Sequence, residues 1–210
     1  YDKYGKDAPL VLIYHTHGTE AYAECASCGY RTEDTSLNVV AVGDVITDSL
    51  TKKGIGTIHI KEMFDIEDFN TAYDRSTEAV RDVLADNPSI QYVLDIHRDS
   101  VDRNGDYIKC MSEIDGKECA QLMLVCGTDE GGSDHKKWQN NLTFSLQLQS
   151  SLWEKSPSLM RAIDLKEASF YQDTRAGALI VEFGTSANTL EEAKSSARIF
   201  ADTLSEYMEK

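Results

Sequence analysis

Short continuous runs of apolar residues alternate along the chain with longer segments in which apolar residues recur every three or four positions. The short runs are typical of strands buried on both faces and fall at residues 9–14, 55–60, 90–96 and 178–181. The longer segments are typical of amphipathic helices and fall at residues 36–53, 69–84, 138–153 and from 189 onward. This alternation predicts an α/β fold with a twisted, mostly parallel central sheet and helices on both faces.

Turn and capping signals refine this pattern. Thr189 and Glu192 have the spacing of a capping box at the start of the last helix, and Ser156-Pro157 opens a short helix. The pair Asp115-Gly116 predicts an added β-hairpin formed by residues 107–114 and 119–126. No internal repeat, linker or shift in composition divides the chain, so we expect residues 1–210 to form a single catalytic domain.

Composition and charge narrow the classes of function. Hydrophobic residues make up 41% of the chain, which is typical of a globular protein. With 21 basic and 36 acidic residues, the net charge of −15 argues against binding of nucleic acid or an anionic membrane surface. No apolar run approaches the ~20 residues that span a bilayer. Because the chain starts at Tyr1 and not at Met, we expect any N-terminal membrane anchor to lie outside it.

Five cysteines form an odd set. Cys25 and Cys28 have C-x-x-C spacing, but no second pair completes a zinc ribbon and no thioredoxin-like pattern surrounds them. A local disulfide or free thiols are therefore expected, and redox catalysis is not.

Polar residues gather where the predicted buried strands end. Residues 15–20 follow the first strand, residues 95–99 end the third, and residues 182–184 end the last. Because ligands bind outside the carboxyl ends of strands in open α/β sheets, these groups predict a functional site at that edge.

The residue types favour a zinc site. Catalytic zinc takes three His, Asp or Glu ligands and keeps a position open for water, and His17, Glu20 and His97 supply such a set. Glu182 lies after a buried strand, where burial raises a carboxyl pKa, and is the candidate general base. Glu33-Asp34 is a rival source of the third ligand, although capping of the next helix is the favoured role for this pair.

Other polar residues at these strand ends have supporting roles or none. His15, Arg98 and Asp99 are candidates for contacting substrate or supporting the ligands, with a local ion pair as the alternative for Arg98 and Asp99. Asp95 is placed to be an outer carboxylate behind a ligand. His59, inside a strand, is expected to be structural.

His135 is expected to be solvated, because it lies in a glycine-rich loop. No G-x-S-x-G nucleophile elbow, Walker loop or dinucleotide fingerprint is present.

Taken together, these motifs resemble the stage II sporulation protein P family. The resemblance rests on residues 11–22, 38–43, 95–99, 138–142, 182–184 and 188–189, and it covers nearly the whole chain. That family is similar to the zinc-dependent N-acetylmuramoyl-L-alanine amidases, so the resemblance implies an amidase-like fold and Zn²⁺ as cofactor. By the same resemblance His17 and His97 match metal ligands and Glu182 matches the catalytic glutamate. Glu20 is the preferred third ligand, with residues 33–34 as the fallback.

The resemblance also implies a biological setting. Family members hydrolyse peptidoglycan during engulfment of the forespore, cleaving the amide between N-acetylmuramic acid and L-alanine and also peptide cross-links. They are anchored outside the cytoplasmic membrane and act with sporulation protein D, which cuts the glycan strand. Two alternatives remain open: a carboxypeptidase-like zinc peptidase, and a non-catalytic module that binds the wall or serves as a scaffold.

Overall fold

A six-stranded sheet forms the centre of the protein, which is described here by a computed structural model covering residues 8–209. The strand order is β2-β1-β3-β10-β8-β9. The strands are β1 (Val11–Tyr14), β2 (Thr57–His59), β3 (Tyr92–Asp99), β8 (Leu122–Gly127), β9 (Asp164–Lys166) and β10 (Gly177–Thr185). The strands β2, β1, β3 and β10 run parallel to one another, whereas β8 is antiparallel to β10. The prediction of a mostly parallel sheet is therefore confirmed.

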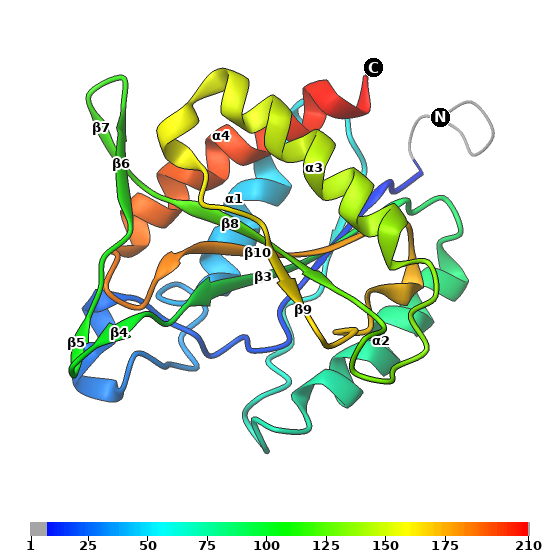
Figure 1. Ribbon diagram of the computed structural model, residues 1–210, viewed down its shortest axis with the longest axis horizontal. Coiled ribbons are helices and arrows are strands. Elements are labelled where there is room, and N and C mark those ends of the chain that lie inside the picture. Colours follow the sequence, from blue (N-terminus) through cyan, green and yellow to red (C-terminus); the bar gives the residue numbers. More distant parts are fainter. Residues whose placement is uncertain (1–7, 210) are drawn as a thin grey trace.

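Helices cover both faces of this sheet, as predicted. They are α1 (Val39–Lys52), α2 (Ala72–Asp86), α3 (Trp138–Lys155) and α4 (Leu190–Met208), with short 3₁₀ helices η1 (Ala23–Cys28), η2 (Pro157–Leu159) and η3 (Gln172–Thr174). Figure 1 shows α1, α3 and α4 on one side of the sheet and α2 on the other. No helix among residues 8–209 is both long enough and apolar enough to cross a membrane.

Alternation along β3 determines which side chains face α2. Leu94 and Ile96 pack into the large core with α1, α3 and α4, whereas Val93 packs with residues of α2. Because successive side chains of a strand point to opposite faces, Asp95 and His97 share the α2 face with Val93.

The same alternation in β10 places Glu182 beside His97. Leu179 and Val181 join the large core, and Ala178 packs with residues of α2. Glu182 therefore lies on the α2 face and pairs in register with His97 of the neighbouring strand. Glu182 and His97 thus meet because the apolar runs of β10 and β3 pair in parallel.

Capping sets where the helices begin. Asn38 caps α1 by accepting a hydrogen bond from Val40, and the capping box of Thr189 with Glu192 at the start of α4 is confirmed. The predicted start of the second helix is wrong by three residues, because α2 begins at Ala72 and Phe69 lies in the preceding loop.

The predicted β-hairpin is shorter than expected. Its turn at Asp115-Gly116 is confirmed, but only β6 (Met111–Ile114) and β7 (Lys117–Ala120) pair across it. The apolar run at 122–127 is β8 of the main sheet, because every residue of that run is buried against the helices or β10. Before it, β4 (Asp102–Arg103) pairs with β5 (Asp106–Tyr107), and Figure 1 shows the β6–β7 hairpin projecting from the body.

The five cysteines all lie within the described residues, and all carry free thiols. The Cys25–Cys28 pair lies in η1, with Cys25 buried and Cys28 exposed. The sequence left a local disulfide and free thiols as alternatives, and the structure contains free thiols.

Gly184 lies where the pairing of β10 with β3 shifts register, between Glu182 and Thr185. Its φ is +71°, and a Cβ there would lie 2.7 Å from both Ala120 Cβ and Asn188 Oδ1. We expect G184A to lower the free energy of unfolding by about 2–4 kcal/mol, through left-handed backbone strain plus overpacking. Gly116 has a similar φ of +74° but nothing within 4 Å of an added Cβ, so G116A should cost only about 1 kcal/mol. Urea unfolding of both variants measures the difference, and equal losses would contradict the steric argument.

Candidate metal centre and active site

The predicted ligands meet at the carboxyl edge of the sheet. His17, Glu20 and His97 each offer one ligand atom, and these atoms all lie within 4.8 Å of one another. All three side chains are buried. The ligand set inferred from strand ends is therefore brought together in space, and it includes Glu20.

The loop after β1 is held in place by hydrogen bonds to β3. Both the backbone N–H and the hydroxyl of Thr16 donate to the carboxylate of Asp95, at 2.9 and 2.7 Å. The next residues form a turn in which Glu20 N donates to the carbonyl of His17. Gly18 fits because the loop approaches Met63 so closely that a Cβ would lie 2.5 Å from Met63 Cγ. This packing fixes where the His17 and Glu20 side chains start.

A buried row of charged groups connects Glu20, His97 and Asp95. His97 Nδ1 lies 3.2 Å from Glu20 Oε2, and His97 Nε2 lies 2.9 Å from Asp95 Oδ1. Burial opposes the charged form of His97, but Asp95 and Glu20 together raise its pKa well above the usual value. Burial alone would raise the pKa of Glu20, but the hydrogen bond from His97 and the charges of His97 and Arg98 lower it to about 2.

Glu182 has the opposite electrostatic character. Burial raises the pKa of Glu182 to about 8, and the nearby carboxylates of Glu20 and Asp99 add to the effect while His97 opposes it. Its Oε2 is buried without a hydrogen-bond partner among the described residues, although the residue as a whole is partly exposed. Such a carboxyl group can hold or release a proton near neutral pH.

Aromatic side chains from α2 and the loop before it surround His17. The ring of Phe69 stacks on His17 with centroids 3.9 Å apart, and Tyr73 contacts it edge-on at 5.4 Å. Burial lowers the pKa of His17, and the nearby charge of His97 lowers it further. A neutral imidazole is the form that binds a metal ion.

The residues present fit a zinc ion. Two imidazoles and one carboxylate are a common donor set for catalytic zinc. His97 has one nitrogen facing Glu20 and the other facing the Asp95 carboxylate, which is the arrangement that orients metal-binding histidines in proteins. Asp95 thus lies where an outer carboxylate was predicted.

His15 lies behind the site and not in it. It is fully buried, its Nδ1 is 3.0 Å from the carbonyl oxygen of Ile96, and its Nε2 is 2.8 Å from His59 Nε2. His59 Nδ1 lies 3.1 Å from Asp44, so both histidines have protein partners. These contacts support a positioning role for His15 and a structural one for His59.

Arg98 is directed toward the segment that carries Glu20. Its backbone N–H donates to Glu20 Oε2, and its guanidinium donates to the carbonyl oxygens of Ala21 and Tyr30. Asp99 instead accepts a hydrogen bond from Arg161 at 2.7 Å. The alternative of a local ion pair between Arg98 and Asp99 is therefore not what the structure contains, because each side chain contacts another segment.

The rival ligands and one histidine are placed differently from the expectation. Glu33 and Asp34 are both exposed and lie outside the ligand group, and Asp34 accepts from Ser36 in a turn before α1, whose cap is Asn38. The expectation that His135 is solvated is wrong, because it is 1% exposed.

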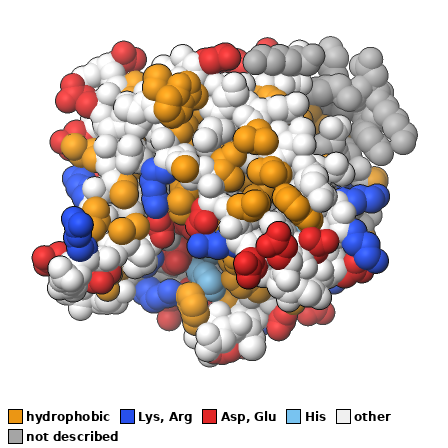
Figure 2. Space-filling model, in the orientation of Figure 1, with side chains coloured by type: hydrophobic (Ala, Val, Ile, Leu, Met, Phe, Trp, Pro, Cys, Tyr) orange, Lys and Arg blue, Asp and Glu red, His pale blue; other side chains and the backbone are white. Residues whose placement is uncertain are grey.

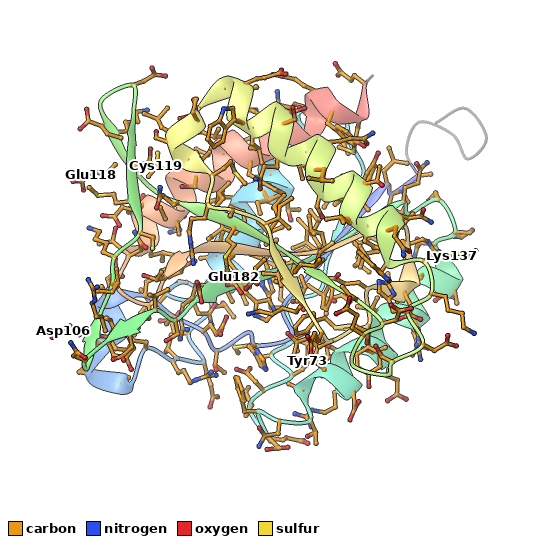
Figure 3. The ribbon with its side chains drawn as sticks, viewed as in Figure 1. Tyr73, Asp106, Glu118, Cys119, Lys137 and Glu182 are labelled. Carbon is orange, nitrogen blue, oxygen red and sulfur yellow. The ribbon has the colours of Figure 1, made fainter. Side chains whose placement is uncertain are left out.

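Sequence reasoning missed the contribution of the segment between β2 and α2. Asp65 and Phe69 come from this segment and Tyr73 comes from the first turn of α2, and all three lie around the His17 loop. The apolar spacing of Phe69 and Tyr73 assigns them to a buried helix face, and nothing in the sequence signals that the helix end meets β1. Figure 3 shows Glu182 and Tyr73 in the interior part of the view, away from the peripheral Asp106, Glu118 and Lys137. Figure 2 shows a histidine in a hollow bordered by acidic, basic and hydrophobic side chains.

The fold is an α/β fold of the kind found in amidase catalytic domains. Solved structures with the same fold include the N-acetylmuramoyl-L-alanine amidase AmiC2 of Nostoc punctiforme, at a TM-score of 0.58 and 15% identity over 98% of this chain and 99% of that one. The catalytic domain of the amidase CwlV from Bacillus (Paenibacillus) polymyxa var. colistinus matches with a TM-score of 0.59 and 13% identity, over 96% and 98% of the two chains. The CwlD amidase of Clostridioides difficile, solved in complex with the GerS lipoprotein, matches with a TM-score of 0.56 and 13% identity, over 95% and 98%.

The sequence comparison identifies the family. The family model of stage II sporulation protein P matches residues 3–205, so the chain belongs to that family. It is 33% identical to stage II sporulation protein P of Bacillus subtilis (strain 168) over 215 aligned residues, which cover 95% of this chain and 51% of that relative. The chain thus spans about half the length of the relative.

Metal binding should release protons. In the metal-free protein His97 holds a proton between two carboxylates, and Glu182 has a pKa of about 8, so both are largely protonated at pH 7. We expect zinc binding at pH 7 to release roughly one to two protons per ion, and the apparent affinity to rise with pH until His97 is neutral. Calorimetry in two buffers of different ionisation enthalpy measures the number of protons released per zinc ion.

D95N provides the matched variant for this measurement. Without the Asp95 charge the pKa of His97 falls, so D95N should release fewer protons, and loss of the outer carboxylate should weaken zinc binding about 10–100-fold. Zinc binding without net proton release in the unaltered protein would contradict the charge state assigned to His97.

Proposed function

We propose that this chain is the catalytic domain of a zinc-dependent peptidoglycan hydrolase that acts in sporulation and cleaves the amide between N-acetylmuramic acid and L-alanine. The observation that carries the proposal is the convergence of His17, Glu20 and His97 within 4.8 Å, with Glu182 in register beside His97. The family and the fold of the amidase structures support the same reaction.

His17, Glu20 and His97 would hold the ion. A zinc ion there would act as a Lewis acid on the scissile carbonyl and make water acidic enough to lose a proton near neutral pH. The chain's own contribution is a set of donors fixed before binding: Glu20 by Arg98 and His97 by Asp95. Fixed donors lower the cost of organising the site.

Glu182 would move the proton. As a carboxylate it accepts a proton from the attacking water, and as an acid it returns that proton to the leaving nitrogen. Its partly buried position keeps the pKa near 8, so both forms are accessible near neutral pH. The unpartnered Oε2 is available for this exchange.

The surrounding residues would position these groups. Arg98 ties Glu20 to β3, and His15 supports the end of β1 from behind. Asp99 is held by Arg161 at the rim of the same edge, where it contributes to the raised pKa of Glu182. Replacing any of these three residues should therefore lower the activity less than replacing Glu182 does.

The family also suggests the setting of the reaction. We propose that the domain acts outside the cytoplasmic membrane, between the mother-cell and forespore membranes, held there by an anchor beyond the chain described. A glycan-cleaving partner such as sporulation protein D would supply shorter strands as substrate. Cleavage of peptide cross-links is a second activity expected from the family.

Replacing the proton carrier tests the mechanism. E182Q should retain zinc, because Glu182 is outside the ligand group, and should lose at least about 100-fold of its activity on purified cell wall. The measurement is a wall digest with mass analysis of products, alongside elemental analysis of bound metal. E118Q, on the exposed hairpin strand β7, is the matched control and should behave as the unaltered protein.

The same digest separates the competing reactions. Amidase action frees the stem peptide from muramic acid, cross-link cleavage yields separated peptides still bound to sugar, and a carboxypeptidase releases terminal amino acids. A chelator should abolish the activity, and added zinc should restore it. A protein that holds no metal and leaves cell wall intact would contradict the proposal and favour a binding module.

A further inference from the structure

A cavity of about 380 Å³ lies beside the candidate metal centre. One wall is the segment that carries Arg31 and Glu33, and the other is the loop before α2, with Asp65, Ile66 and Phe69. None of these residues belongs to the ligand group or takes part in the proton transfer described above. The cavity therefore needs its own explanation.

One aromatic ring connects this cavity to the metal centre. Phe69 stacks on the predicted ligand His17 at 3.9 Å, and the Arg31 guanidinium carbon lies 4.6 Å from the centroid of the same ring. His17 and Arg31 thus contact the same aromatic ring, which places a ligand group bound at Arg31 close to the candidate metal centre.

Arg31 is held by hydrogen bonds from one guanidinium nitrogen, and its other two nitrogens remain available to bind a ligand. Nη1 donates to Thr19 Oγ1 at 3.0 Å and to Asp65 Oδ2 at 2.9 Å. None of the described residues accepts a hydrogen bond from Nε or Nη2, and the side chain is 38% exposed. The Nε–Nη2 edge of a guanidinium presents two parallel N–H groups, which match the two oxygens of a carboxylate.

Asp65 holds the guanidinium in this orientation. Its side chain is fully buried, and it also accepts hydrogen bonds from the backbone N–H and the hydroxyl of Thr19. Arg31 is therefore ordered before any ligand arrives, which lowers the entropy cost of binding. Glu33 is the opposing charge in the cavity, but it is exposed, where water and salt weaken its repulsion.

We propose that this cavity binds the stem peptide, with Arg31 pairing through Nε and Nη2 with the free carboxylate of its second residue, D-glutamate. This inference rests on the proposed function, because the substrate follows from it. The free carboxylate of the second residue lies within about two residue lengths, ~7 Å, of the amide that is cut. That distance is comparable to the spacing from His17 through the Phe69 ring to the Arg31 guanidinium. The half-exposed Ile66 and Phe69 would cover the aliphatic part of the peptide.

A binding measurement without turnover tests the assignment. The probes are two muramoyl tripeptides that differ only at the second residue, which is D-glutamate in one and D-isoglutamine in the other. Calorimetry on the E182Q protein should show the carboxylate form binding about tenfold more tightly, as a charge-assisted bidentate pair provides. Equal affinities, including no measurable binding of either tripeptide, would overturn the inference.

Two variants assign the preference to Arg31. R31K keeps a positive charge beside Asp65 but loses the forked edge, so with E182Q it should fold normally and reduce the preference to about twofold or less. R103Q, on the exposed strand β4, is the matched control and should keep the full preference. Thermal unfolding checks that each variant is folded, and an unchanged preference in folded R31K would overturn the role of Arg31.

The outcomes also separate this inference from the proposed function. Hydrolysis of cell wall combined with equal binding of the two tripeptides would remove the carboxylate subsite and leave the amidase. A clear tripeptide preference that depends on Arg31, without wall hydrolysis by the unaltered chain, would support the subsite while removing the proposed activity.

Discussion

Charges buried away from water must balance one another, and this constraint organises the carboxyl edge of the sheet. Glu20, His97 and Asp95 form one row in which an imidazole lies between two carboxylates. Arg98 lies 3.6 Å from Glu20 and supplies a second positive charge, so two cations balance two carboxylates. Removing either acid would leave an uncompensated buried positive charge, which costs several kcal/mol. The row also joins the loop after β1 to β3, so the electrostatic balance and the position of the predicted ligands depend on the same contacts.

Much of this arrangement could be predicted from the sequence because strands impose a strict alternation. In β3 the apolar Leu94 and Ile96 must face the core, which places Asp95 and His97 together on the other face. The parallel alignment of neighbouring strands then brings their polar ends to one edge. The prediction of Glu20 as a ligand depended on the family motif as well, since spacing alone did not separate it from the acids at 33–34.

The parts that could not be predicted depend on loops and on contacts between distant segments. Phe69 looks like a helix residue from its spacing, yet it precedes α2 and stacks on His17 from the loop before that helix. His135 looks solvated from its polar, glycine-rich surroundings, yet it is buried. Periodicity reports which face of an element is buried, but it contains no information on where a loop closes or which side chain it covers.

Two glutamates at the same edge illustrate how environment assigns chemical roles. Glu20 is surrounded by His97 and the backbone N–H and guanidinium of Arg98, which keep it ionised with a pKa of about 2. Glu182 has one buried oxygen without a partner and feels the negative charge of Glu20, so its pKa is about 8. The acid that stays charged is suited to hold a cation, and the acid that titrates near neutral pH is suited to carry a proton. Exchanging these two environments would leave the composition of the site unchanged and remove its chemistry, so the hydrogen-bond partners of the glutamates matter as much as the glutamates themselves.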